Sequence, residues 1–322
     1  MTPIFQILAD NQDITSKIAD RLLSLTIVDE AGIRSDTAQI TLDDRDNAIE
    51  LPRTGAELVV SISYKETKLV KTGLYIVDEV SISSPPHSMS IRAKAANMPK
   101  AIKAPKTRPW DNVTIGDLVK TIAEEHGLTA KVGEDLASVA IVHMDQTQES
   151  DLNLLTRMAK QYDAISKPVG GMLLFVKRAM GKSVSGKTLP ETTIKPADIT
   201  SWDVTLTERG KYGAVQAEWH NNATAIREKV QAGDGEPVFP LRRSYPDKAQ
   251  AQAAVDAKLA IFNRGTGGLE ITMPGNPALM AEGIINLEGF RSGVDGRWLL
   301  NSVTHTIGAQ GFITSISGEG AK

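Results

Sequence analysis

Asp43, Asp44 and Asp46 form a dense acidic group, and clustered carboxylates are the oxygen ligands that a hard cation such as Ca²⁺ binds. The stretch does not match the Asp-x-Asp-x-Asp-Gly pattern of a calcium loop, and no Glu lies twelve positions on. Arg45 would compete with a cation as counter-charge. The acids directly follow an alternating strand, so we expect them to form a polar turn at its end.

Five histidines are the remaining candidates for a metal site. They are His87, His126, His143, His220 and His305. None has the i, i+4 spacing or the H-E-x-x-H pattern of a helical zinc site, and the chain has no cysteine. We expect surface or strand positions for all five, with His126 in the last turn of a helix, where a cation suits the helix dipole.

Enzymatic motifs are weak. Glu149 and Asp151 could act as the acid pair of a tail-associated peptidoglycan hydrolase, but two carboxylates near a helix start are also expected from capping. Gly265–Gly268 lacks the Lys-Ser/Thr of a phosphate loop and follows a helix, and no G-x-S-x-G elbow occurs. We therefore expect no catalytic, cofactor-binding or metal-binding residues, and keep the hydrolase as the alternative function.

Composition excludes several classes of protein. The 322 residues carry 36 Lys and Arg against 39 Asp and Glu, a net charge of −3, which is too balanced for a dedicated nucleic-acid binder. Apolar runs are too short to cross a membrane, and the N-terminal MTPIFQILADNQD lacks the basic leader of a secretory signal. We expect synthesis and folding in the cytosol, no membrane span and no specific nucleic acid.

Short alternating strands dominate residues 1–97. Leu25 and Ile27 alternate with polar residues, as do Ile40 and Leu42 after a turn, and the pattern continues in ELVVSISY and GLYIVDEVSIS. Such spacing favours an antiparallel barrel or sandwich. Residues 98–112, MPKAIKAPKTRPWDN, are rich in proline and basic residues and follow Asn97. They predict a solvated linker, or alternatively a basic rim facing an acidic partner.

Residues 113–190 have the pattern of a small α+β module. Thr114 with Asp117 predicts a capping box, Gly127 a helix stop, and Ser150 the start of a second helix before a strand in GGMLLFVKR. Strands return over residues 191–322, with a helix at about 245–264. The predicted fold is mainly β with an α+β insertion: two antiparallel β-barrel domains, the α+β module and an inserted helix.

Six segments resemble the phage late control protein D family, in the same order along nearly the whole chain. They are RLLSLTIVDEAGIRSDTAQITLDDRD, LPRTGAEL, GLYIVDEVSISSPP, TIGDLVKTIAEEHGL, QTQESDLNLLTRMAKQYDA and GFRSGVDGRWLLNSVTHTI. The resemblance implies a baseplate hub of a contractile tail or tail-like particle, similar to the hub part of VgrG-like spikes. It also implies that both β domains are of the tail-tube type.

The same resemblance implies a homotrimer whose six barrels form a pseudo-hexameric ring. Such a ring would join the sixfold tail tube, or a tube initiator, to a threefold central spike, with other baseplate proteins and the tape measure protein as further partners. The particle would assemble in the host cytoplasm. On this view Asp43, Asp44 and Asp46 form a polar barrel rim that sets partner and register. The only support for a DNA-binding regulator is the basic stretch Lys100–Arg108.

Overall fold

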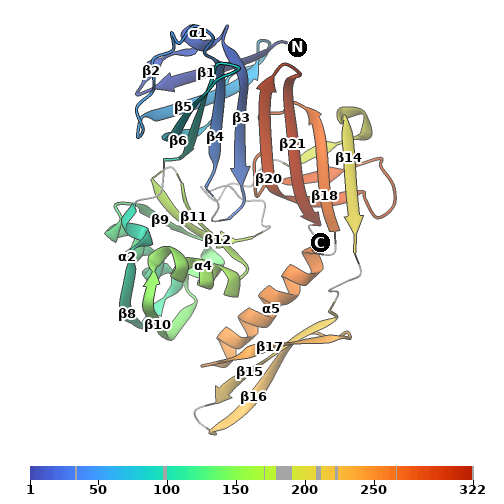
Figure 1. Ribbon diagram of the computed structural model, residues 1–322. Helices are drawn as coiled ribbons and strands as arrows, with labels where there is room; N and C mark the ends of the chain where they lie inside the picture. Colours follow the sequence, from blue (N-terminus) through green and yellow to red (C-terminus); the bar gives the residue numbers. More distant parts are fainter. Residues whose placement is uncertain are drawn as a thin grey trace.

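The computed structural model describes residues 1–32, 35–96, 100–169, 171–178, 191–207, 212–221, 224–265 and 267–320. Strands dominate, so the prediction of a mainly β chain with an α+β insertion is confirmed. Figure 1 shows the first β region in blue beside the last strands in red, the green module below them, and a helix with three strands at the lower end. The predicted boundaries at residues 97 and 190 lie outside the described residues.

The first β region holds seven strands and a short helix. They are β1 (Pro3–Ala9), β2 (Gln12–Asp13), α1 (Thr15–Ile18), β3 (Leu22–Glu30), β4 (Thr37–Asp43), β5 (Glu57–Tyr64), β6 (Val70–Ser83) and β7 (Ser88–Ala95). Alternate residues of these strands point into one core, which includes Leu25, Ile40 and Val60. The period-2 pattern of the sequence therefore gives the buried face correctly.

The module contains η1 (Lys100–Lys103), β8 (Pro105–Thr114), α2 (Ile115–Glu125), β9 (Thr129–Val132), α3 (Glu134–Ala137), β10 (Ala140–Ser150), α4 (Asp151–Gln161), β11 (Ala164–Val169) and β12 (Met172–Lys177). The helix signals hold: Thr114 and Asp117 form the capping box, and Ser150 caps α4. The linker prediction for residues 98–112 is wrong over most of its length, because β8 pairs with β10 in a two-stranded ribbon.

The last region returns to the large sheet with β13 (Thr192–Ile194), η2 (Pro196–Asp198), β14 (Ser201–Leu206), β18 (Gly267–Pro274), β19 (Ile284–Leu287), β20 (Gly296–Gly308) and β21 (Gly311–Gly320). Its insertion is larger than the single predicted helix. Strands β15 (Ala214–Asn221), β16 (Ile226–Gly233) and β17 (Val238–Tyr245) form a separate sheet, and α5 (Lys248–Arg264) packs on it around Val215 and Val255.

The two β regions share one sheet. Its order is β14-β18-β21-β20-β3-β4-β7-β6-β5-β1-β2, and the join is the antiparallel pair β20–β3. Each region keeps its own core, but Ile307 and Phe312 from the β20–β21 hairpin lie in the core of the first region. Phe312 contacts Tyr64, with ring centroids 5.3 Å apart. This shared packing makes the two regions one structural unit.

Candidate functional site

One face of the shared sheet carries hydroxyl side chains across both β regions. The register places Thr306 beside Thr26, and Thr304 beside Ser315. We call this the hydroxyl face, and its members are Ser24, Thr26, Thr41, Ser90, Thr272, Thr304, Thr306, Ser315 and Ser317. All of them are half-buried, whereas their neighbours along each strand point into the two cores.

The hydroxyl face lacks the features of a tight protein interface. Binding hot spots are enriched in Trp, Tyr and Arg, whereas hydroxyl side chains predominate on this face, with Val28, Arg92 and Ile313 among them in the register. Their hydroxyls form cross-strand contacts, such as Thr272 to Ser315 at 3.4 Å, and Ser90 accepts a hydrogen bond from Gln39. A broad face of this kind offers a partner few large apolar side chains to bury.

A partly buried ionic group, which we call the central junction, joins the module to the first β region. Lys167 on β11 donates to the carboxylate of Asp36 at 2.6 Å and to the carbonyl of Glu30 at 2.9 Å, and its ammonium lies 3.6 Å from Asp29. Asp29 also accepts from the backbone N–H of Ala281 at 2.8 Å, so the last region reaches the same point.

The junction continues through arginines to the insertion. Arg264, the last residue of α5, is buried and pairs with both carboxylate oxygens of Asp163 in the module. Its Nε donates to Glu319 on β21 at 3.0 Å, and Arg178 lies 3.7 Å from the same carboxylate. Arg178 also donates to Asn301 at 2.7 Å. Charged pairs therefore fix the position of every unit relative to the others.

Burial changes the acidity of this junction. Burial, reinforced by the nearby carboxylate of Asp36, raises the pKa of Asp29 to about 6. Burial likewise raises the pKa of Glu282, which accepts from the N–H of Gly32 at 3.0 Å. Both carboxylates lie in contacts between the first and last β regions, so their protonation is coupled to the way these regions meet.

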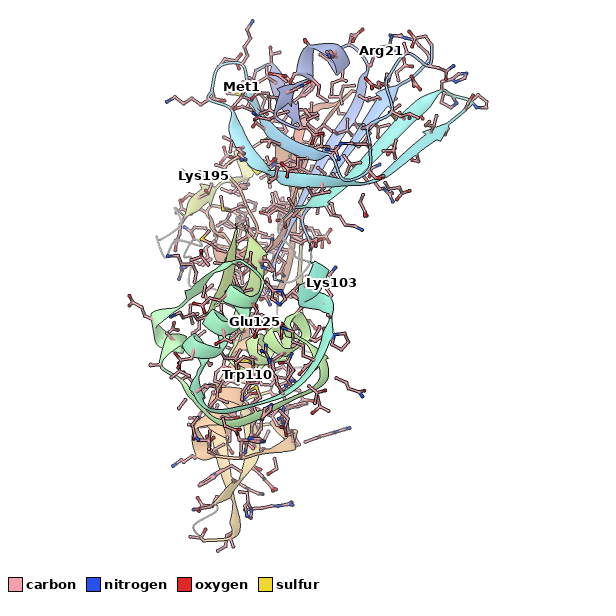
Figure 2. All side chains as sticks on the ribbon, turned by 90° about the vertical axis from the view of Figure 1, so that its left-hand side faces the viewer. Met1, Arg21, Lys103, Trp110, Glu125 and Lys195 are labelled. Atoms are coloured by element: carbon pink, nitrogen blue, oxygen red, sulfur yellow. The ribbon has the colours of Figure 1, made fainter. Side chains whose placement is uncertain are left out.

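A second ionic group lies inside the module. Asp151, fully buried at the start of α4, accepts from Lys106 at 2.6 Å, from Arg108 at 3.0 Å and from the side-chain amide of Gln146 at 2.9 Å. It also contacts His126 at 2.8 Å. Glu125 binds the same two cations. Figure 2 shows Glu125 and Trp110 within this part of the molecule, far from Arg21 at the distal end of the first β region.

Charge balance in this group argues against a metal. Ligand atoms of Glu125, His126 and Asp151 lie within 4.8 Å of one another, which is close enough for one ion. However, the Lys106 ammonium contacts both carboxylates at 2.6 Å and occupies the position of a cation. Burial alone would raise the pKa of Asp151, but Lys106, Gln146 and His126 outweigh it and hold that pKa below its usual range.

Asp43, Asp44 and Asp46 lie in a turn at the end of β4, as predicted. β4 ends at Asp43, which accepts from the N–H of Arg45, and buried Asp44 accepts from the N–H of Ile49. Asp46 forms a two-point ion pair with Arg21, and this pairing holds the pKa of Asp46 far below its ordinary value. The three acids close a turn and do not converge on a common point.

The histidines divide into exposed and buried positions. His87 lies in an exposed turn, and His143 and His220 are exposed on strands, as expected. Hydrogen bonds that its ring donates to the carboxylates of Asp111 and Asp145 raise the pKa of His143. His305 lies on strand β20, also as expected, but is buried between Thr314 and the carbonyl of Leu279, and burial lowers its pKa to about 4.

The expectation for His126 is confirmed for its place at the end of a helix, but its expected exposure is wrong. It follows the last residue of α2, but its side chain is only 4% exposed and contacts Asp151. The helix-end position is visible in the sequence, whereas the contact joins residues 25 positions apart. The central junction was likewise missed, because its pairs span more than a hundred residues and have no local pattern.

The candidate acid pair is neutralised. Glu149 pairs with Arg157 at 2.8 Å, and Asp151 is enclosed by Lys106, Arg108 and His126. A glycosidase needs one carboxyl with a raised pKa as its acid, and Asp151 has a lowered pKa. The geometry gives the hydrolase no support.

The glycine and basic stretches serve structural roles. Gly265 caps α5, Gly267 and Gly268 open β18, and Thr266 between them lies outside the described residues. The basic stretch Lys100–Arg108 enters β8, where Lys106 and Arg108 bind Asp151 and Glu125 instead of forming a free cationic patch. No described helix is long and apolar enough to span a membrane.

Comparison with known proteins gives the family. The profile of the phage tail baseplate hub (GPD) family matches residues 41–311. The chain belongs to this family. The probable baseplate hub proteins of Escherichia phages 186 and P2 are each 32% identical to it, over 98% of this chain and 92% of theirs. The resemblance to the late control protein D family is thereby confirmed, and the protein is a structural baseplate hub of a phage tail.

Solved tail proteins share the fold at low sequence identity. The 43 kDa tail protein of prophage MuSo2 from Shewanella oneidensis has a TM-score of 0.72 at 14% identity, covering 98% of both chains. The tail protein from Neisseria meningitidis MC58 also has a TM-score of 0.72, at 13% identity, covering 99% of this chain and 96% of its own. An Escherichia coli component of the type VI secretion system, described as similar to T4 tail proteins gp27 and gp5, has a TM-score of 0.56 at 12% identity and covers 92% and 73%.

Proposed function

We propose that three copies of this hub form a ring in which the hydroxyl face lines the central opening. The observation that carries the proposal is the single sheet through both β regions, with cores on one side and hydroxyls on the other. A ring must turn one face inward, and the face on which hydroxyls predominate, with Val28 and Ile313 as its apolar members, is the one suited to a wetted channel. The two β regions of each copy would then give the ring six similar sectors.

This ring would join a sixfold tail tube, or a tube initiator, to a threefold spike in a contractile tail or tail-like particle. Baseplate proteins and the tape measure protein are the further proposed neighbours, and the hub would assemble in the host cytoplasm without catalysing a reaction. In this arrangement Asp43, Asp44 and Asp46 lie at the end of β4 and belong to the rim of the first β region. Paired charges at a rim tune partner choice and on-rate more than affinity.

Sedimentation of the purified hub, alone and mixed with the spike protein of the same phage, tests the proposal. We expect a trimer that shifts to a larger complex when the spike is added. A strict monomer that binds neither spike nor tube protein would overturn it. Zymography on peptidoglycan is the matched test of the alternative: clearing that is lost in Glu149→Gln would support a hydrolase.

A further inference from the structure

The shared sheet has two open edges that lie at opposite ends of a run of strands. The run is β14-β18-β21-β20-β3-β4-β7-β6. Within the described residues β14 pairs with β18 alone, and β6 from Asp78 to Ser83 pairs with β7 alone, because β5 reaches only as far as Ile76. An edge with unpaired backbone groups is a template for pairing with another chain.

Strand direction suits the pairing of these two edges. Every neighbouring pair in the run is antiparallel. The two end strands, β14 and β6, therefore run in opposite directions. Rotation about an axis that lies along the strands keeps those directions, so β14 of one copy would meet β6 of the next as an antiparallel pair. The contact would continue the pattern of the sheet.

The backbone phase of the two edges also agrees. In an antiparallel ladder, the N–H and C=O of successive residues point alternately to the two neighbouring strands. The backbone hydrogen bonds at the end of β18 show which of its residues face β21 and which face β14. On β14, the backbone N–H and C=O of Trp202, Val204 and Leu206 therefore point away from β18, toward the open edge. The bonds at the end of β7 show in the same way that the backbone N–H and C=O of Val80 and Ile82 point away from β7, toward the open edge of β6.

Side chains match in the same register. The outward-directed residues on both edges have apolar side chains on the core side of the sheet, where Val204 and Val80 pack against the two cores. At the open edges Trp202 is 42% exposed, Leu206 61% and Ile82 54%. Pairing would place apolar beside apolar and leave Thr205 and Ser81 together on the hydroxyl side. A register shift of one residue in either strand would instead place apolar side chains beside hydroxyl side chains.

We propose that β14 of one copy pairs with the Asp78–Ser83 segment of β6 in a second copy, so that the hydroxyl faces join into one surface. The contact uses two different patches of the chain, which is the type of interface that closes into a ring. This inference rests on the proposed ring and names the surfaces that form it.

Cysteine cross-linking tests the contact directly, because the chain contains no cysteine. The variant Thr205→Cys/Ser81→Cys, treated with a short bismaleimide, should give a denaturing-gel ladder of dimer and trimer. Each single variant alone should give none, and a mixture of the two single variants should give only a dimer. Lys120→Cys/Ser81→Cys is the control pair, with an exposed position on helix α2 away from the edges.

Sedimentation of the same samples distinguishes the proposed trimeric ring from the proposed contact between β14 and β6. A trimer that cross-links through positions 205 and 81 supports both, and a trimer that does not cross-link there, or does so equally with the control pair, overturns this contact but not the ring. A monomer overturns both. Ile82→Asp should raise the concentration for half-assembly at least about tenfold, since it places charge on an apolar contact. Its melting profile should match the wild type at dilutions where both proteins are monomeric. Val142→Asp, at a residue 57% exposed on β10, should leave assembly unchanged.

Discussion

The ammonium of Lys167 lies 2.6 Å from a carboxylate oxygen of Asp36, a residue 131 positions away in the sequence. The contact joins the module to the first β region. Through Asp29 and the backbone of Ala281 it reaches the last region as well. A baseplate hub must keep its units in fixed positions, and this junction is the part of the chain best placed to do so.

Replacement of Lys167 by methionine should destabilise the protein by about 2–3 kcal/mol, because it leaves partly buried carboxylates without their charged donor. The urea midpoint measures the effect. The control is Lys131→Met, which changes an exposed lysine on β9. Equal midpoints for the two variants would show that the junction does not hold the units together.

Asp29→Asn should change the pH dependence of stability. Because the pKa of Asp29 is about 6 in the folded chain and about 4 in an unfolded one, its proton stabilises the fold below pH 4, and this contribution is lost as the pH rises through 6. Relative to the wild type, the variant should therefore gain stability between pH 4 and pH 7. Urea unfolding across this range measures the difference, and a constant difference would contradict the assigned pKa.

His305 should change the pH dependence of stability in the direction opposite to Asp29. Its pKa is about 4 in the folded chain against about 6.5 unfolded, so its contribution is present above pH 6.5 and lost as the pH falls through 4. The shift corresponds to about 3 kcal/mol over that window. His305→Gln should lose less stability on acidification than the wild type. Parallel curves for the two proteins would mean that folding does not shift the pKa of His305.

Asp151→Asn should destabilise the module by about 3 kcal/mol or more, because Lys106 and Arg108 would keep their charges beside a neutral amide. Glu149→Gln breaks a less buried pair and should cost within about 1 kcal/mol. Thermal unfolding of both variants gives the comparison. A larger effect at Glu149 would reverse the roles assigned to these two acids.

Chelation of divalent cations should leave the melting temperature unchanged. Lys106 already occupies the position between Glu125 and Asp151 that an ion would take. Scanning calorimetry with and without EDTA is sufficient. A lower melting temperature in EDTA, restored by one added metal, would show that the group formed by Glu125, His126 and Asp151 binds that metal.

Local features of the fold were predictable from the sequence. The capping box at Thr114 and Asp117, the cap at Ser150 and the end of β4 at Asp43 each depend on residues within a few positions. Alternation also identified the buried face of β3 and β4. Such features follow from short-range hydrogen bonding and side-chain periodicity.

Features set by distant partners were not predictable. Pro105 and Pro109 suggested a linker, yet both lie in β8, where proline is tolerated because a two-stranded ribbon leaves each strand an open edge. The alternation in β15 predicted a strand correctly but could not tell which sheet it joins. The ion pairs of Lys167 and Arg264 depend on folding across more than a hundred residues.

An electron cryomicroscopy reconstruction of the intact phage tail tests the central claim most directly. We predict three hub copies in a ring between tube and spike, with Thr26, Thr304 and Ser315 facing the central opening. A different copy number, or a ring whose hydroxyl face is buried under a neighbouring protein, would contradict this account.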